Sequence, residues 1–134
     1  ASSLILSPRG DEVAVRSHDT VYRVGVPDGA VRGAWKLKSL ALAYSPDSRY
    51  LAVATLVDVV LFDCATGLEV ARFDVAPGMY DTMCFTRDGA RLVTADCDST
   101  VLVWDVAEAT AGVAAPSATK KAPTKKTPAK KARG

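Results

Sequence analysis

In the stretch DSTVLVWDV, Asp98 to Val106, a Trp-Asp pair follows an apolar run, and the same pattern recurs earlier in the chain. When the chain is aligned on this pair, Trp104-Asp105 lies over Phe62-Asp63 and over Val24-Gly25. Recurrence at a nearly constant distance of about 40 residues is the signature of a repeat architecture. The chain is therefore read as a set of repeats.

Two further markers keep the same spacing. The tetrapeptides SPRG (7–10), SPDS (45–48) and TRDG (86–89) follow one another at this distance. The turn glycines Gly29 and Gly67 have the same spacing as the first two tetrapeptides. Three independent markers in one alignment make a chance match improbable. They define three repeats at about residues 3–35, 39–73 and 79–106.

Each repeat has the pattern of four short β-strands. In the second repeat, apolar runs of four to six residues are separated by turn signals, and Val, Leu, Tyr and Phe are typical strand residues. In the SPDS segment, Pro presets φ at the second position and Ser bonds the backbone from the first, as in a type I turn. We predict one four-stranded antiparallel meander per repeat, with strands in the second at Leu40–Tyr44, Tyr50–Thr55, Val59–Phe62 and Leu68–Phe73.

Two of these runs also predict how the sheets are covered. LAVA (51–54) and VVLF (59–62) are apolar at consecutive positions instead of alternating ones. A strand with this pattern is buried on both faces, which a lone sheet with one face in water does not provide. Four-stranded sheets stacked face to face around an axis do provide it, so the predicted fold class is all-β, a β-propeller.

The combination of SPDS/TRDG turns, LAVA/LVTA strands and DSTVLVWD resembles the WD-repeat β-propeller family over about residues 3–106. The resemblance implies a buried structural network in which Thr94 and Asp98 hold the indole N–H of Trp104. Buried indole and carboxylate groups both need hydrogen-bond partners. The chain departs from the family at Met79, which stands where the family has His, and at Val24-Gly25, which replaces the aromatic-Asp pair.

Three repeats do not complete a propeller. A closed ring has at least four blades, so three leave two large apolar faces in water. No β-branched or aromatic run for a fourth strand follows Asp105, and in the family the last blade commonly takes its outermost strand from the start of the chain. We expect residues 1–106 to be the last three blades of a larger propeller, with the remaining blades or further copies of the chain as neighbours.

Residues 107–134 differ in composition from the rest. Residues 1–106 carry 10 Lys and Arg against 14 Asp and Glu, whereas residues 107–134 carry seven basic residues and one acid. With Pro123 and Pro128 and little apolar surface, this segment is predicted to be a disordered tail. It resembles the Lys/Ala/Pro-rich tails of linker histones and of some bacterial DNA-compacting proteins. Its candidate nucleic-acid-binding residues are Lys120, Lys121, Lys125, Lys126, Lys130, Lys131 and Arg133; a merely solubilising terminus is the alternative.

The residues needed for catalysis are scarce. His18 is the only histidine and lies in a polar loop, SHDT, where a solvated residue is expected. Cys64, Cys84 and Cys97 have no CxxC spacing, so neither a zinc site nor a disulfide framework is predicted, and a reducing, cytoplasmic location is expected. The nine glycines are scattered at turns and form no phosphate-binding loop.

These observations predict a non-catalytic scaffold that binds other proteins at a propeller rim, without cofactor, metal or membrane span. No apolar run approaches the roughly 18 residues that a span needs. The basic tail adds the possibility of non-specific DNA or RNA binding. The alternative is a regulatory or substrate-recruiting propeller segment of a larger enzyme, for example a kinase fusion, with its catalytic domain upstream of residue 1.

Overall fold

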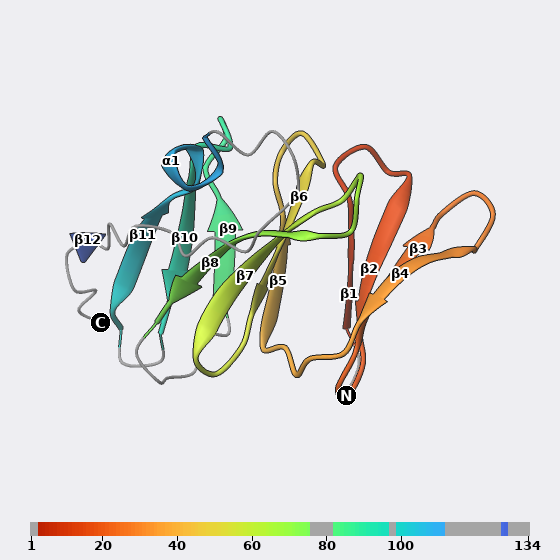
Figure 1. Cartoon of the computed structure of the whole chain (residues 1–134), viewed down its shortest axis with the longest axis horizontal. Helices are drawn as coiled ribbons and strands as arrows, with labels where there is room; N and C mark the ends of the chain where they lie inside the picture. Colours follow the sequence, from red (N-terminus) through yellow and green to blue (C-terminus); the bar gives the residue numbers. More distant parts are fainter. Residues whose placement is uncertain (1–2, 76–81, 97–98, 112–126, 129–134) are drawn as a thin grey trace.

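Three antiparallel sheets follow one another along the chain and stand side by side, each in the role of one blade (Figure 1). The computed structural model describes residues 3–75, 82–96, 99–111 and 127–128. Each sheet has four strands, and in each the first three strands follow chain order from one edge. The predicted all-β fold of four-stranded meanders is confirmed.

The first two blades are complete meanders. The first blade contains β1 (Ser3–Leu6), β2 (Glu12–Arg16), β3 (Val21–Gly25) and β4 (Val31–Trp35). The second contains β5 (Ala41–Tyr44), β6 (Tyr50–Ala54), β7 (Asp58–Asp63) and β8 (Glu69–Asp74). Every strand end in the second blade lies within one residue of its predicted position.

The third blade holds β9 (Thr82–Phe85), β10 (Arg91–Ala95) and β11 (Val101–Asp105), with β12 (Thr127–Pro128) as its fourth strand. The expected disordered tail from residue 107 is corrected at two places. Thr127 and Pro128 pair with β11, and a proline is tolerated there because β12 is an edge strand.

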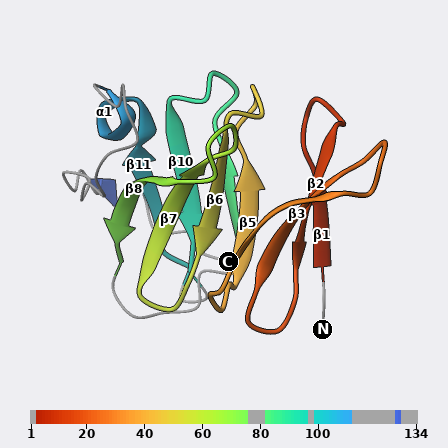
Figure 2. The same cartoon turned by 45° about the vertical axis from the view of Figure 1, so that its right-hand side comes forward.

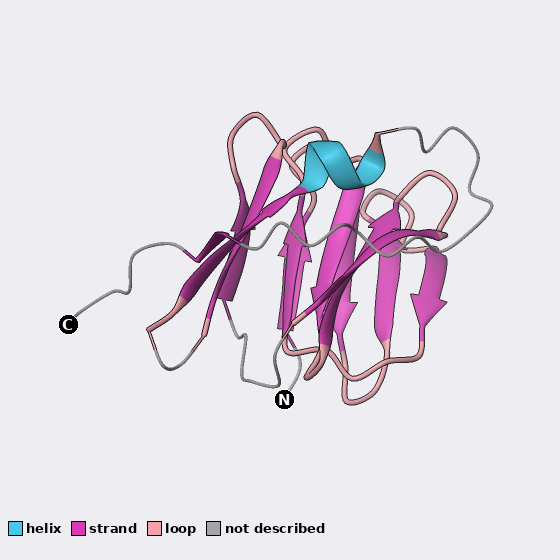
Figure 3. Ribbon diagram, turned by 60° about the vertical axis from the view of Figure 1, so that its left-hand side comes forward, coloured by secondary structure: helices cyan, strands magenta, loops and turns pink. Residues whose placement is uncertain are grey.

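The second correction is the helix α1 (Val106–Thr110), which continues directly from β11 (Figure 3). The side chain of Asp105 caps it by accepting a hydrogen bond of 2.9 Å from the backbone N–H of Glu108. Val106 and Ala109 are buried against the core between the second and third blades. The predicted boundary at residue 106 was therefore too early. It was placed where the β-strand signals stop, and a capped helix of Ala and Glu does not show such signals.

The tight turns explain why SPRG, SPDS and TRDG recur. In each, the backbone N–H of the fourth residue donates to the carbonyl of the first at 2.8–2.9 Å. The fourth residues Gly10, Ser48 and Gly89 have φ of 77°, 62° and 75°, the left-handed region in which glycine is favoured. The hydroxyl of the first residue then accepts from the backbone N–H that opens the next strand, as Ser45 does from Tyr50 at 2.9 Å.

The second blade is buried on both faces, as predicted from its consecutive apolar residues. All five residues of β6 are buried, and so are those of β7 up to Phe62. We call the face of the second blade toward the first blade its front and the opposite face its back, and use the same terms for equivalent positions in the other blades. One core lies between the first and second blades and another between the second and third.

Candidate protein interaction site between the first two blades

Two charged residues interrupt the apolar strands of the first blade. Glu12 on β2 and Arg23 on β3 occupy the positions that Tyr50 and Leu61 hold in the second blade, one repeat later. Both are 5 % exposed. Buried charges are costly unless they are paired and hydrogen-bonded, so their partners decide whether this interface is stable.

Arg23 is held from three sides. Its Nη1 donates to Oε1 of Glu12 at 3.2 Å and to the backbone carbonyl of Cys64, on the second blade, at 2.6 Å. The guanidinium also lies 5.2 Å from the ring centre of Trp35, within cation–π distance. Within the described part of the chain its Nε has no hydrogen-bond partner. The guanidinium thus connects the first blade to the backbone of the second.

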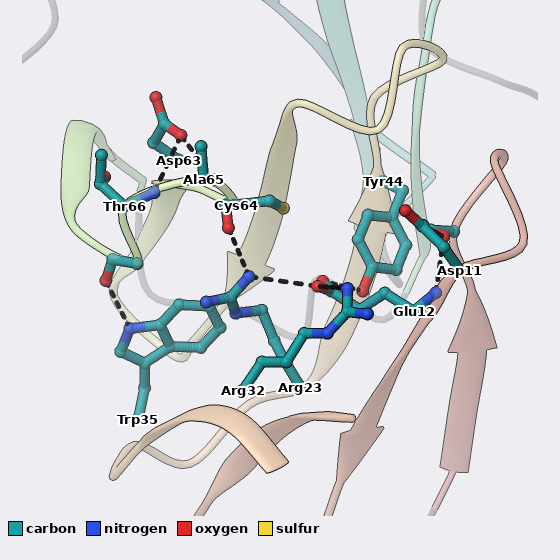
Figure 4. A network of polar contacts seen from close by, with 12 residues as sticks. Asp11, Glu12, Arg23, Arg32, Trp35, Tyr44, Asp63, Cys64, Ala65 and Thr66 are labelled. Atoms are coloured by element: carbon teal, nitrogen blue, oxygen red, sulfur yellow. Dashed lines mark hydrogen bonds and ion pairs between the residues drawn. The ribbon is translucent and has the colours of Figure 1, made fainter. Parts of the chain in front are cut away.

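Glu12 has partners on both of its oxygens. The hydroxyl of Tyr44, on β5 of the second blade, donates to Oε2 at 2.8 Å, and Nη1 of the half-exposed Arg32 lies 3.5 Å from Oε1 (Figure 4). Burial and the hydrogen bond to this carboxylate raise the pKa of Tyr44 far above its usual value. Tyr44 therefore stays protonated and remains a hydrogen-bond donor.

Trp35 extends the contact to the outer strands. Its ring stacks on Phe62 of the second blade with centroids 4.0 Å apart and planes 18° apart. Its indole N–H donates to the backbone carbonyl of Gly67 at 3.0 Å. The interface between these blades therefore combines an apolar core with a connected polar network.

A cleft opens beside this network, at the edge where the turns of the two blades meet. Its volume is about 430 Å³. Three arginines and three aspartates line it together with Glu12: Arg9, Arg32, Arg49, Asp11, Asp47 and Asp63. Figure 4 shows Arg32, Asp11 and Asp63 around the network. The cleft therefore carries both signs of charge.

The aspartates are fixed by the turns that carry them. Asp63 Oδ1 accepts from the backbone N–H of Ala65 at 2.8 Å, and Asp11 Oδ1 accepts from the hydroxyl of Ser7 at 3.0 Å. Partial desolvation of the exposed Asp47 opposes its ionisation, but hydrogen bonds from the Ser45 hydroxyl and the Arg49 backbone lower its pKa overall. These carboxylates are thus held at set positions.

Arginines beside carboxylates that are held at set positions suit a polar partner chain that carries both kinds of group. Among the described residues, no group of three His, Cys, Asp or Glu side chains is arranged to hold a metal ion. His18 is exposed in the loop between β2 and β3, away from the cleft. None of the described helices is long and apolar enough to cross a membrane.

Of the three residues predicted to form a buried network in the third blade, the structure brings two together. The indole N–H of Trp104 donates to the hydroxyl of Thr94 at 3.1 Å, and both residues are fully buried. Phe73 of the second blade packs on the indole, with centroids 5.2 Å apart. Asp98 and the basic residues from Lys120 to Arg133 lie outside the described residues.

The network of Glu12, Arg23 and Tyr44 was missed in the sequence. A signal for it was present, because the alignment of the repeats places an acid and a base where the second repeat has Tyr50 and Leu61. An acid and a base that both interrupt the buried face of one repeat indicate a buried ion pair. Tyr44 carried no such signal, since tyrosine is an ordinary strand residue.

No family model matches the sequence. A search of curated proteins finds "U3 snoRNP-associated protein-like EMB2271" of Arabidopsis thaliana, 36 % identical over 69 residues. The match covers 51 % of this chain and 14 % of the Arabidopsis protein.

Solved structures match a larger part of this chain and show its fold. The WD40 repeats of RRP9 match with a TM-score of 0.73 and 20 % identity over 78 % of this chain, and the β-propeller domain of Cps50 (Swd1) from Myceliophteria thermophila with 0.70 and 18 % over 78 %. Hydrazine synthase of Kuenenia stuttgartiensis matches with 0.69 and 21 % over 77 %. The chain spans 32–35 % of these structures. Its fold is thus that of WD40 β-propeller blades, as the resemblance implied.

Proposed function

We propose that this chain is a non-catalytic scaffold that binds another protein in the cleft between its first two blades. The observation that carries the proposal is the cleft itself, which presents three guanidinium groups and three fixed carboxylates beside a rigid interface. A phosphate backbone would be repelled by the carboxylates, whereas a protein segment with both acidic and basic side chains meets complementary groups.

The similar proteins support a role within an assembly. Their names include a U3 snoRNP-associated protein, and U3-55K matches with a TM-score of 0.73 over 78 % of this chain. We extend to this chain only the general role of a subunit that contacts other proteins. Because the chain spans about a third of the matched structures, the blades described here supply one part of such a binding surface.

Site-specific photo-crosslinking in the cells of origin tests this proposal. A photoreactive residue replaces the exposed Ala65, which lines the cleft, and in a control replaces the exposed Leu56 in the turn at the other end of β6. We expect one discrete protein adduct from position 65 and none of that mass from position 56. Mass spectrometry identifies the attached protein.

Charge reversal makes the test specific to the cleft. Arg49→Glu should abolish the adduct from position 65, whereas Arg87→Glu, at another exposed arginine in a turn of the third blade, should leave it unchanged. Absence of an adduct at position 65, or equal loss with both variants, would contradict binding in this cleft.

A second candidate is a propeller segment that serves a larger enzyme. The structural similarity to hydrazine synthase is the observation that favours it. Under this alternative the cleft binds a catalytic domain of the same assembly instead of a separate protein. Mass spectrometry of the adduct from position 65 distinguishes the two, because the attached peptides then belong to an enzyme.

A further inference from the structure

The turns between the first two strands of each blade have the same backbone hydrogen bond but different charges. In the second and third blades the third turn residue is an aspartate, Asp47 or Asp88, whose Oδ1 accepts from the hydroxyl of the first residue at 2.7 Å. It also accepts from the backbone N–H two residues later. The first blade has Arg9 at this position, and there Asp11 accepts from the hydroxyl of Ser7. Arg9 thus stands where the turn itself favours an aspartate.

The second turn departs from the shared pattern at its fourth residue. Ser48 has a φ of 62° at the position where the other two turns have Gly10 and Gly89. A side chain is strained in this left-handed region, whereas glycine is not. The hydroxyl of Ser48 makes a contact that glycine lacks, because it accepts a 3.1 Å hydrogen bond from the backbone N–H of Arg9 on the first blade. The two departures therefore meet, and strained residues of this kind cluster at functional sites.

The contact brings two arginines from different blades to the same cleft (Figure 2 shows the two blades side by side). Arg9 belongs to the first blade and Arg49, which directly follows Ser48, to the second, and both are exposed. The guanidinium of Arg49 lies 5.1 Å from the ring centre of Tyr50, within cation–π distance. Within the described part of the chain, neither guanidinium forms a hydrogen bond or an ion pair. Both are therefore open to an incoming acceptor.

The carboxylates of the cleft are engaged by the protein itself. Glu12, on the back of the first blade, accepts from Arg23 and Tyr44. Asp63 accepts from the backbone N–H of Ala65. The aspartates of the first two turns accept from serine hydroxyls. The donors on the two turn arginines are thus the groups that the cleft leaves for a ligand.

We propose that the cleft recognises an acidic side chain, Asp or Glu, of the partner protein through Arg9 and Arg49, which the Ser48 contact holds in place. This rests on the proposed function, since it names the group by which the partner is bound. A guanidinium binds a carboxylate through two parallel hydrogen bonds. A nucleic acid carries a charge on every phosphate and would meet the aspartates of the cleft as well, whereas one acidic side chain with uncharged neighbours meets the arginines alone.

Nuclear magnetic resonance of the full chain, labelled in nitrogen, tests the proposal. The probe is the peptide acetyl-Gly-Gly-Glu-Gly-Gly-amide, and its control has Gln in place of Glu. We expect the side-chain N–H signals of Arg9 and Arg49 to shift in a saturable way with the Glu peptide and to stay unchanged with the Gln peptide. Arg9→Gln and Arg49→Gln assign these signals, because each variant lacks one of them.

The same two variants measure the contribution of each arginine. Each should raise the peptide concentration at half-saturation, read from the remaining arginine, by about fivefold or more. Arg87→Gln, at an exposed arginine in the turn of the third blade, should leave that concentration unchanged. An equal effect of all three variants would overturn recognition by the pair Arg9 and Arg49.

Ser48→Gly separates binding from stability. Glycine suits a φ of 62°, so the urea midpoint should not fall. Binding of the Glu peptide should still weaken, because the backbone of Arg9 loses its partner on the second blade. A lower urea midpoint with unchanged peptide binding would overturn the positioning role of this contact.

The outcomes distinguish this proposal from the proposed function. If the adduct forms at position 65 but the Glu peptide shifts neither arginine signal, the protein partner stands and recognition of a carboxylate is overturned. If the peptide binds but no adduct forms, the carboxylate site stands and the protein partner is contradicted. Inorganic phosphate is the last probe: a stronger shift of both signals with phosphate than with the Glu peptide at equal concentration would overturn the acidic side chain as the ligand.

Discussion

The hydroxyl of Tyr44, on the second blade, donates a 2.8 Å hydrogen bond to Glu12, on the first, across an otherwise largely apolar interface. The same carboxylate is 3.2 Å from Arg23, whose guanidinium binds the backbone of Cys64. The donor, the carboxylate and the guanidinium therefore depend on one another. Their geometry fixes how the first blade sits on the second, and Glu12 also lines the adjoining cleft.

Tyr44→Phe removes the donor and leaves the aromatic ring in place. We expect the free energy of unfolding to fall by about 1–3 kcal/mol, because a buried carboxylate loses one hydrogen bond that nothing else supplies. Urea denaturation followed by circular dichroism measures it. Tyr22→Phe, at an exposed tyrosine of the first blade, is the control and should change stability by less than about 0.5 kcal/mol. Equal effects of the two variants would contradict the role of the Tyr44 hydroxyl.

Arg23→Leu gives the first blade the residue that the second has at the same position. We expect a loss of about 3–5 kcal/mol, because Glu12 then stays buried without its main partner. The double variant Glu12→Tyr with Arg23→Leu reproduces the pair of the second blade and should regain most of that loss. If the loss of stability in the double variant equals the sum of the losses in Arg23→Leu and Glu12→Tyr alone, the ion pair is not the cause.

The sequence predicts the fold well because strand and turn signals are local. The SPDS turn lies directly between two apolar runs, so every strand end in the second blade was predicted to within one residue. The double burial of β6 and β7 was also predicted, since it is visible in consecutive apolar residues.

Contacts between blades are less visible in the sequence. Glu12, Tyr44 and Cys64 are far apart in the chain and meet only after two blades have formed and packed. The cap at Asp105 that starts α1 is a local signal, but it follows a strand without any break and was read as the end of the structure. The sequence pattern thus did not predict the long-range polar pairs or the helix that follows a strand without a break.

Cys64 should be far less reactive than an ordinary thiol. Burial, followed by the nearby carboxylate of Glu12, raises the pKa of its thiol to about 12. At pH 8 the reactive thiolate is then roughly a thousandfold scarcer than in a thiol of ordinary pKa. Alkylation with iodoacetamide, followed by mass spectrometry of the peptides, should label the exposed Cys84 long before Cys64. Equal labelling rates in the folded chain would contradict this.

The same thiol makes stability depend on pH. The pKa of the thiol is higher in the folded state than in the unfolded state, so the folded state binds the thiol proton more tightly. The stabilisation of the folded state by this proton is complete below the unfolded pKa. That contribution is lost as pH rises from about 9 toward 12. Urea midpoints measured across this range should fall more steeply for the unmodified chain than for Cys64→Ala. Parallel curves would show that the thiol does not contribute.

Trp104→Ala tests the core between the second and third blades. Trp104 is fully buried, and its indole N–H donates to Thr94. We expect a loss of roughly 3–5 kcal/mol from the cavity, together with the lost hydrogen bond. Thr94→Val keeps the shape and removes only the hydroxyl, so it should cost less, about 1–2 kcal/mol. A loss below about 1 kcal/mol for Trp104→Ala would contradict this packing.

The basic tail leads to a prediction about nucleic acid. Six lysines and Arg133 lie between residues 120 and 133 with no acid among them. Such a segment contacts phosphates without reading bases, so duplex DNA binding should be weak, non-specific and steeply salt-dependent. If about four to seven phosphates are neutralised, the log–log slope of affinity against salt should be roughly −4 to −6. Fluorescence anisotropy of a labelled duplex across a salt series gives the slope. A chain truncated at Pro116 and a full chain with these seven residues replaced by Gln should both lose binding, because residues 1–106 carry a net negative charge. If either variant binds DNA with the affinity of the unmodified chain, or if the interaction does not depend on salt, the mechanism is ruled out.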